Sequence, residues 1–289
     1  MPFPIRVLGR DEFPELLREV PDRPKKLSIR GQLPPRESIY LCVVGSRKTT
    51  PYGRRQCASL IAGLSRAPVP IVIASGLAMG IDAEAHLAAM DAGLKTVALM
   101  PSGLDDKILY PSSNRALAQQ ILKKGGALIS ENPNDFVAML HSFAQRNRIM
   151  AGMSKATLVV EAGEKSGTLI TARLALDYNR EVLCVPHDLG RESGLGVNRL
   201  LREGATLVRD SDDILDALGF PPDSRPEQMA LPSDLTPAEA AVLTALTEPL
   251  VRDELIETSE LSAQEANIAL SSLLIRGLIL ERLGKIERA

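Results

Sequence analysis

Short, almost continuously hydrophobic segments alternate with amphipathic ones between about residues 38 and 219. The hydrophobic segments predict strands at Ile39–Val44, Pro70–Ser75, Lys95–Met100, Ala127–Ser130, Thr157–Glu161, Val182–Pro186 and Thr206–Arg209. The amphipathic segments predict helices at Tyr52–Arg66, Ile81–Asp91, Asn114–Lys124, Ala144–Met153, Gly167–Tyr178 and Val197–Glu203. Buried strands that alternate with helices are typical of βαβ units. The pattern therefore predicts an α/β fold with a doubly wound, mainly parallel sheet over residues 38–220.

The two ends of the chain show different patterns. Residues 1–37 are rich in proline and charge without a clear period, and they stay unassigned. A proline-rich stretch at residues 221–236 predicts a linker. Residues 237–289 follow with three helical patterns and a short β-like end, which predicts a small winged-helix-like domain.

Composition narrows the class of protein. Hydrophobic residues make up 45% of the 289 positions and charged residues 24%, as in ordinary globular proteins. The longest uncharged stretch, residues 67–81, is too short to span a bilayer, and the first residues do not resemble a secretory signal. Three widely spaced cysteines suit a reducing compartment, so we expect a cytoplasmic protein without disulfides or a metal site.

Charge is distributed unevenly along the chain. The net charge is −2, but residues 221–289 carry 12 acids and 6 bases, whereas residues 1–220 carry 24 acids and 28 bases. This asymmetry is compatible with an anion-binding body and an acidic tail domain. Aromatic residues are only 3% of the chain and Trp is absent, so a binding site must depend mainly on backbone amides, hydroxyls and cations.

Four of the turns that follow predicted strands are rich in glycine and hydroxyl residues. In a parallel sheet these turns meet at one edge, where ligands bind. Glycine lets the backbone approach an anion closely, and the free amides of a helix start point toward it. The candidate anion-binding residues in these turns are Gly45, Ser46, Arg47, Ser75, Gly76, Lys165, Ser166, Gly167 and Thr168. Any single turn of this kind can simply be tight packing; the set of four on one edge favours a site.

The segment Ser142–Ile149 adds an aromatic ring, two arginines and amide side chains just before the fifth strand. Phe143 can stack on a base or pack in the core, and the sequence leaves both roles open. Arg146 and Arg148 lie two positions apart on a helix, so at most one of them is expected in the same groove as Arg47. Asn147 lies between them.

Several enzyme classes lack their motifs here. No G-x-G-x-x-G follows the first strand and no Walker A motif is present, which excludes typical dinucleotide-binding and P-loop proteins. No serine has a G-x-S-x-G context. Asp82 and His86 share a helix face, but a capping aspartate beside a packed histidine explains them better than an acid–base pair.

The ordered motifs resemble the DprA/Smf family of DNA-processing proteins over roughly residues 39–219. They are GSRKTTPYG (45–53), SGLAMGIDAEAH (75–86), GLD…YPSSN (103–114), FAQRNRIMAGMS (143–154), SGTLITARLALDYNREVLCVP (166–186) and GVNRLLREGA (196–205). The resemblance implies an extended Rossmann-like domain that binds single-stranded DNA and dimerises. It further implies a non-enzymatic protein without cofactors that loads the RecA recombinase onto incoming DNA in natural transformation. Single-stranded DNA-binding protein is a further candidate partner.

Carried over by motif, Arg47 is the expected principal phosphate contact and Phe143 the expected stacking residue, beside Arg146. The turns at Ser75–Gly76 and Ser166–Thr168 are expected to supply donors, and Lys165 to add charge. The chain departs from the family pattern at Asp106–Leu109, which is two residues longer, and at His187, which replaces a glycine. Both departures lie near the expected binding edge.

Two other functions stay open. A Rossmann-like nucleotide phosphoribohydrolase, resembling the lysine-decarboxylase-like family, would need a glutamate where this chain has Thr171. A pure protein-interaction adaptor would explain the acidic tail domain but not four anion-friendly turns on one edge. Because the predicted third helix of the tail carries few cations, that domain is expected to contact protein rather than duplex DNA.

Overall fold

The computed structural model describes residues 3–221, 235–246, 250–259, 261–276, 278–282 and 284–288. The chain divides into two units, Met1–Pro222 and Asp223–Ala289. Most of the predicted linker, at residues 222–234, lies outside the described residues.

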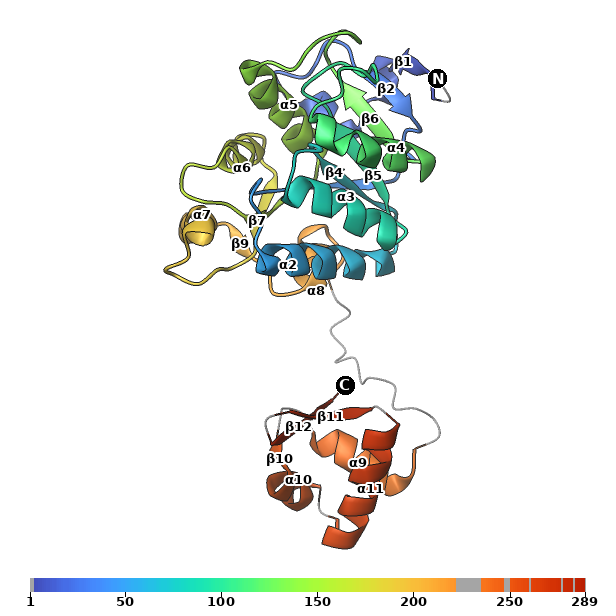
Figure 1. Cartoon of the computed structure of the whole chain (residues 1–289), viewed down its shortest axis with the longest axis vertical. Helices are drawn as coiled ribbons and strands as arrows, with labels where there is room; N and C mark the ends of the chain where they lie inside the picture. The colour runs from blue at the N-terminus through green and yellow to red at the C-terminus, as the bar shows by residue number, and fades with distance from the viewer. Residues whose placement is uncertain are drawn as a thin grey trace. The chain divides into compact units, whose positions relative to one another are not determined.

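The first unit is built on a nine-stranded sheet (Figure 1). Seven of its strands are parallel neighbours in the order β6–β5–β4–β3–β7–β8–β9. They are β3 Ile39–Gly45, β4 Ile71–Ser75, β5 Lys95–Leu99, β6 Ala127–Ser130, β7 Ala156–Glu161, β8 Glu181–Cys184 and β9 Thr206–Leu207. The prediction of a doubly wound, mainly parallel sheet is confirmed.

Side chains of the central strand β3 alternate between two hydrophobic layers. Cys42 and Val44 enter one layer, and Leu41 and Val43 enter the other. Helices α5, α6 and α7 close the first layer, and α2, α3 and α8 close the second. Helix α4 packs beside α3. The helices are α2 Pro51–Ala62, α3 Ile81–Asp91, α4 Arg115–Lys123, α5 Leu140–Met153, α6 Thr168–Asp177, α7 Leu195–Arg202 and α8 Ser211–Ala217, with 3₁₀ turns η2 Gly63–Arg66, η3 Ser112–Asn114 and η4 Glu192–Gly194.

The order of the strands creates a switch point between β3 and β7. The chain passes from β3 to β4, β5 and β6 on one side, and then returns to β7, β8 and β9 on the other. The loop after β3 leads to α2 on one face of the sheet, and the loop after β7 leads to α6 on the opposite face. Ligands of doubly wound proteins bind at the crevice that such diverging loops leave.

The unassigned N-terminal residues belong to the first unit. They form β1 Ile5–Val7, η1 Arg10–Glu12, α1 Glu15–Glu19 and β2 Ser28–Gly31. Strand β2 pairs antiparallel with β6, and β1 pairs antiparallel with β2. The fully buried Arg30 of β2 forms an ion pair of 2.5 Å with Asp106, which lies in the segment that is longer than the family pattern. That segment therefore anchors the N-terminal strands.

The second unit has its own core. Its elements are α9 Pro237–Ala245, β10 Leu250–Val251, α10 Arg252–Thr258, α11 Ala263–Ile275, β11 Ile279–Arg282 and β12 Lys285–Arg288. The strands form an antiparallel sheet in the order β10–β12–β11. The predicted three helices and terminal hairpin are confirmed, and the winged-helix interpretation stays a prediction.

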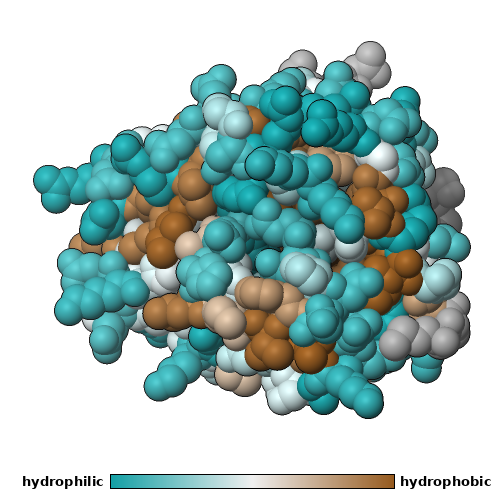
Figure 2. Space-filling view, turned by 90° about the horizontal axis from the view of Figure 1, so that it is seen from above, coloured by the Kyte–Doolittle hydropathy of each residue, from teal (hydrophilic) through white to brown (hydrophobic). Residues whose placement is uncertain are grey.

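Figure 2 shows the molecule from above, with hydrophobic residues in separate small groups among hydrophilic ones. Within the described part of the chain, every helix is too short or too polar to span a lipid bilayer.

Candidate functional site

A pocket of about 1000 Å³ opens at the switch point between β3 and β7. Its walls come from the loop after β3, the loop after β7, and the first half of α5. Ten predicted site residues line it: Gly45, Ser46, Arg47, Phe143, Arg146, Asn147, Lys165, Ser166, Gly167 and Thr168. The structure thus brings together residues that are up to about 120 positions apart in the sequence.

The loop after β3 is held in a fixed shape by a hydrogen bond within it and by one to the end of β7. The Ser46 amide donates to the Glu161 carbonyl at 2.7 Å, and the Ser46 hydroxyl accepts from the Lys48 amide at 3.1 Å. Gly80, with φ of +83°, lies against this loop, and a Cβ there would be 2.2 Å from the Ser46 carbonyl oxygen. Only glycine fits such a position. The turn after β4 therefore buttresses the loop that carries Arg47.

Arg47 extends from this loop beside an aromatic ring. Its guanidinium lies 5.5 Å from the centroid of the Phe143 ring, in cation–π contact. The ring of Tyr110 meets Phe143 edge-on at 5.4 Å between centroids, and Tyr110 is 43% exposed. Phe143 itself is half-buried, so its place is at the rim of the pocket rather than in the core. This position is compatible with stacking on a base.

Arg146 is a buried cation at the base of the pocket. Its Nη1 donates to the carbonyls of Gly76 at 2.6 Å and Leu99 at 2.8 Å, at the ends of β4 and β5. Its Nε donates to Asn147 Oδ1 at 3.1 Å. Burial lowers the pKa of Arg146 and the nearby Asp82 carboxylate raises it. Arg146 therefore acts first as a structural cation that holds two strand ends and the Asn147 side chain.

The expected role of the Ser75–Gly76 turn needs correction. The Ser75 hydroxyl is fully buried and donates to the Val43 carbonyl at 2.6 Å. The Gly76 amide donates to Asp82 Oδ2 at 3.2 Å, and its carbonyl accepts from Arg146. The donors of both residues are thus occupied within the protein, although Gly76 does line a smaller pocket together with Arg47 and Phe143.

The prediction that Asp82 caps a helix is wrong: the N-cap of α3 is Gly80, no described side chain caps that helix end, and Asp82 instead binds the turn that precedes α3. Its Oδ2 accepts from the Gly76 amide and, at 3.4 Å, from the Ala78 amide. Burial raises the pKa of Asp82, and the Arg146 charge opposes that rise. His86 is packed in the core with Nδ1 2.6 Å from the Thr96 hydroxyl. These contacts favour the structural interpretation of both residues.

The start of α6 forms a smaller anion cup than expected. The Thr168 amide donates to the Ser166 hydroxyl at 3.2 Å, and that hydroxyl donates to Thr168 Oγ1 at 3.0 Å. In the described chain, the Gly167 amide makes no hydrogen bond, and a Cβ at Gly167 would meet nothing within 4 Å. The open donors of this turn are thus the Gly167 amide and the Thr168 hydroxyl.

Charge in the pocket is mixed. Its lining has four cations, Arg47, Lys48, Arg146 and Lys165, and three carboxylates, Asp82, Glu164 and Glu192. Arg47, Lys48 and Lys165 are exposed, and none of them has an ion-pair partner in the part of the chain that is described. The cations available to a ligand therefore number three, with Arg146 committed to carbonyls.

Sequence reasoning missed the apolar rim of the site. Leu140 is 91% exposed at the start of α5, and Ile170 is 49% exposed on α6. Tyr110 and Lys48 were also absent from the predicted set, although both lie inside the motifs that carry the resemblance. An exposed leucine cannot be distinguished from a core leucine by its letter, because both fit the same helical period.

Arg148 lies outside the pocket, as its position two residues after Arg146 predicts. Its guanidinium pairs with Glu131 and donates to the Asp22 carbonyl at 2.6 Å. Thr171, which stands where the phosphoribohydrolase hypothesis needs a glutamate, does line the pocket and is 1% exposed.

Comparison with known proteins gives consistent matches. Residues 5–219 match the family described as DNA recombination-mediator protein A. DNA processing protein DprA of Streptococcus pneumoniae is 35% identical over 218 residues, 75% of each protein. Protein Smf of Escherichia coli is 39% identical over 208 residues, which are 72% of this chain and 54% of that protein. The chain thus spans about half the length of this relative.

Two solved structures share the fold. The DNA processing protein A of S. pneumoniae superposes with a TM-score of 0.68, 34% identity and 74% coverage of each chain. The Helicobacter pylori protein, whose structure is described as revealing a single-stranded DNA binding mode, superposes with a TM-score of 0.66 and 29% identity, over 75% of this chain and 96% of that one. With the family match over most of its length, this chain belongs to the DprA/Smf family of DNA recombination-mediator proteins.

Proposed function

We propose that the pocket at the β3–β7 switch point binds single-stranded DNA without cleaving it. The observation that carries this proposal is a set of exposed cations, Arg47, Lys48 and Lys165, around one pocket with an aromatic rim; none of the three forms an ion pair among the described residues. Cations along a groove bind the phosphate backbone, and aromatic rings stack on bases of any sequence. The single-stranded DNA binding mode described for the H. pylori relative supports the same use.

The pocket residues have distinct roles in this proposal. Arg47 contacts a phosphate, where its guanidinium fork can bind two oxygens. Phe143 offers one ring face to a base while Tyr110 supports its edge. The Gly167 amide and the Thr168 hydroxyl donate to a second phosphate at the start of α6, with Lys165 beside them. Since these contacts address phosphates and ring faces, sequence preference is expected to be weak.

The wider function follows from the family. We infer that the bound strand is protected and handed to the RecA recombinase in recombination or natural transformation, in the cytoplasm. We also infer a homodimer formed through the first unit. The second unit, as a winged-helix-like domain of acidic composition, is proposed to contact protein. Single-stranded DNA-binding protein is a further proposed partner.

Equilibrium binding of a 30-nucleotide strand and of its duplex tests the proposal. With three phosphate contacts, the affinity for the strand is expected to fall roughly 20-fold between about 50 and 200 mM salt, at ~0.7 per contact. Arg47→Ala should reduce the affinity at least about fivefold at 0.1 M salt and lower the slope by about 0.7. Arg55→Ala, an exposed position on α2, is the matched control and should stay within twofold.

Two results would contradict the proposal. Equal, weak binding of strand and duplex would exclude a strand-specific pocket, and Arg47→Ala binding like Arg55→Ala would remove Arg47 from the interface. Hydrolysis of nucleoside monophosphates would favour the phosphoribohydrolase hypothesis instead, although Thr171 supplies no carboxylate there.

A further inference from the structure

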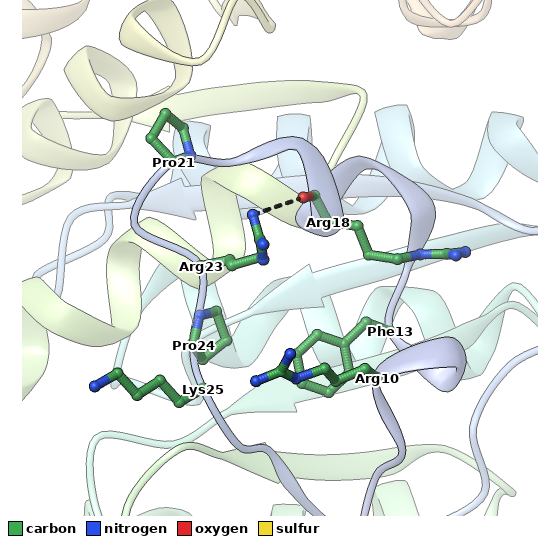
Figure 3. Close-up of a pocket in the computed structure, with 7 residues that line it drawn as sticks. All are labelled: Arg10, Phe13, Arg18, Pro21, Arg23, Pro24 and Lys25. Carbon is green, nitrogen blue, oxygen red and sulfur yellow. Dashed lines mark hydrogen bonds between the residues drawn. The ribbon is translucent and has the colours of Figure 1, made fainter.

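A second pocket, of about 410 Å³, lies in the N-terminal segment (Figure 3). Arg23, Pro24 and Lys25 lie along one side of it, and Phe13 and Arg10 along the other. Arg18 and Pro21 complete the lining, so the pocket has four cations and no carboxylate. None of its residues lines the larger pocket.

The four cations are not neutralised by neighbouring acids. Among the described residues, none of them takes part in an ion pair. Three acids close in sequence are committed elsewhere: Glu12 pairs with Arg6 at 2.8 Å, Glu19 pairs with Arg180 at 3.0 Å, and Asp22 accepts from the Tyr178 hydroxyl at 2.6 Å. Asp11 and Glu15 form no ion pair among the described residues, and neither lines the pocket. The lining itself has four cations and no acid, so the walls of the pocket present net positive charge to solvent.

The frame around these cations is rigid. Phe13 is 4% exposed and Pro24 is buried, so both walls are anchored in the core. The Arg23 amide donates to the Val20 carbonyl at 3.2 Å, and its Nη1 donates to the Arg18 carbonyl at 3.3 Å (Figure 3). Prolines on each side of Asp22 and Arg23 restrict the backbone further. A preorganised pocket loses less conformational entropy when it binds a ligand.

We propose that this pocket is a second anion site, which takes phosphate groups. Three of its four cations are arginines, whose planar guanidinium suits phosphate oxygens better than an ammonium does. The phosphates can come from a nucleic-acid strand that continues beyond the larger pocket, or from a free phosphate compound. Binding of a nucleic-acid strand rests on the proposed function, and binding of a free phosphate compound does not.

Helix α5 connects the two pockets. Asn147 lines the larger pocket, and the next residue, Arg148, donates to the carbonyl of Asp22 in the proline-flanked loop. Helix α1 packs on the same helix α5. In this proposal a long strand crosses α5 and meets both pockets, whereas a short strand fills the larger one alone.

The test uses the full chain with the double variant Arg10→Gln/Lys25→Gln. Both side chains are exposed and make no hydrogen bond or ion pair with other described residues, so the core is spared. Arg54→Gln/Arg55→Gln on α2 removes the same charge from another surface and is the control. Fluorescence anisotropy at 0.1 M salt measures binding of 8- and 40-nucleotide thymidine strands, and thermal unfolding monitors the fold.

If a strand is the source, the Arg10→Gln/Lys25→Gln variant should bind the 40-nucleotide strand about 25-fold more weakly, at about fivefold per lost contact, and the 8-nucleotide strand normally. If a free phosphate compound is the source, inorganic pyrophosphate should raise the Tm of Arg47→Ala protein, and the added double substitution should abolish that rise. Either result supports the site.

The proposal is overturned if Arg10→Gln/Lys25→Gln behaves like Arg54→Gln/Arg55→Gln with both strands and with pyrophosphate. Failure of the proposed function has a different signature. In that case Arg47→Ala would bind the 8-nucleotide strand as well as the unmodified protein does, while the pyrophosphate result would still report on the N-terminal pocket.

Discussion

Gly76 and Arg146 lie 70 positions apart in the sequence, yet each requires the other. The Gly76 carbonyl accepts from Arg146 Nη1 at 2.6 Å, and a Cβ at Gly76 would lie 2.0 Å from the same atom. Because glycine has no Cβ, the buried guanidinium of Arg146 has room to bind two strand ends and to orient Asn147 toward the pocket. The local shape of the site thus depends on a buried cation more than on the turn that precedes it.

Replacing Gly76 by alanine should therefore displace Arg146. We expect the free energy of unfolding to fall by about 1–3 kcal/mol, because overpacking a filled site costs this much. The affinity for single-stranded DNA should fall as well, since Asn147 loses its partner. Chemical denaturation and strand binding measure the two effects. Gly190→Ala, where a Cβ meets nothing within 4 Å and which does not line the pocket, is the control and should leave both stability and affinity unchanged.

His86 gives the protein an acid-sensitive position away from the pocket. It is fully buried, and burial, followed by the charge of Arg146, lowers its pKa from 6.5 to about 3. The unfolded chain takes up a proton at about pH 6.5 while the folded protein does not. Stability is therefore intact above this pH and is lost as the pH falls from 6.5 toward 3.

Protonation of His86 in the unfolded chain should by itself lower the free energy of unfolding by about 2 kcal/mol between pH 7 and pH 5. The His86→Leu variant lacks this contribution, so its free energy of unfolding should depend less steeply on pH, even if its stability at pH 7 is lower. Urea unfolding at a series of pH values measures the difference. The exposed His141→Leu variant should follow the unmodified protein. Parallel curves for His86→Leu and the unmodified protein would contradict a neutral buried histidine.

Helix α5 serves two purposes on its different faces. Phe143, Arg146 and Asn147 line the larger pocket. Arg148 instead pairs with Glu131, where both side chains are mostly buried, at 18% and 19% exposed. It also donates to Asp22 and so fastens the N-terminal segment to the sheet.

Arg148→Ala should consequently separate stability from binding. We expect the free energy of unfolding to fall by about 1–3 kcal/mol, since Glu131 is left without its cation in a mostly buried place. The affinity for an 8-nucleotide strand should stay within twofold, because that strand fills only the larger pocket. A loss of affinity as large as that of Arg47→Ala would instead put Arg148 in the binding site.

Six of the seven parallel strands could be predicted from the sequence because they are almost wholly buried and each reads as one hydrophobic run, whereas both residues of the short edge strand β9 are exposed. Strands β1 and β2 could not be predicted in this way. In β1 the pattern is half-buried and exposed, and β2 contains Arg30, a buried charge whose partner Asp106 lies 76 positions away in the sequence. The position of the pocket could also be predicted, because the turns after parallel strands meet at one edge of the sheet. The sequence did not show which hydrogen-bond donors stay free, since Ser75 and Gly76 bond with Val43, Asp82 and Arg146 from other segments.

At the scale of the whole molecule, charge is divided between the two units. Residues 221–289 carry six more acids than bases, while residues 1–220 carry four more bases than acids. Each hydrophobic cluster lies within one unit: three clusters belong to the first and the fourth belongs to the second. The first unit is therefore expected to fold without the second, and the acidic composition of the second is expected to oppose the binding of a polyanion.

A chain that ends at residue 221 tests this division. We expect it to keep cooperative unfolding and to bind a 30-nucleotide strand roughly two- to fivefold more tightly than the full chain near 50 mM salt, because an acidic domain no longer repels the phosphates. At about 0.5 M salt the two proteins should bind alike, since charges more than a few ångströms apart are then screened. A matched chain in which six acids of the second unit are changed to their amides should reproduce the effect without any truncation. If the shortened chain instead binds more weakly at every salt concentration, the second unit contributes contacts to the DNA, and its acidic composition does not determine its role.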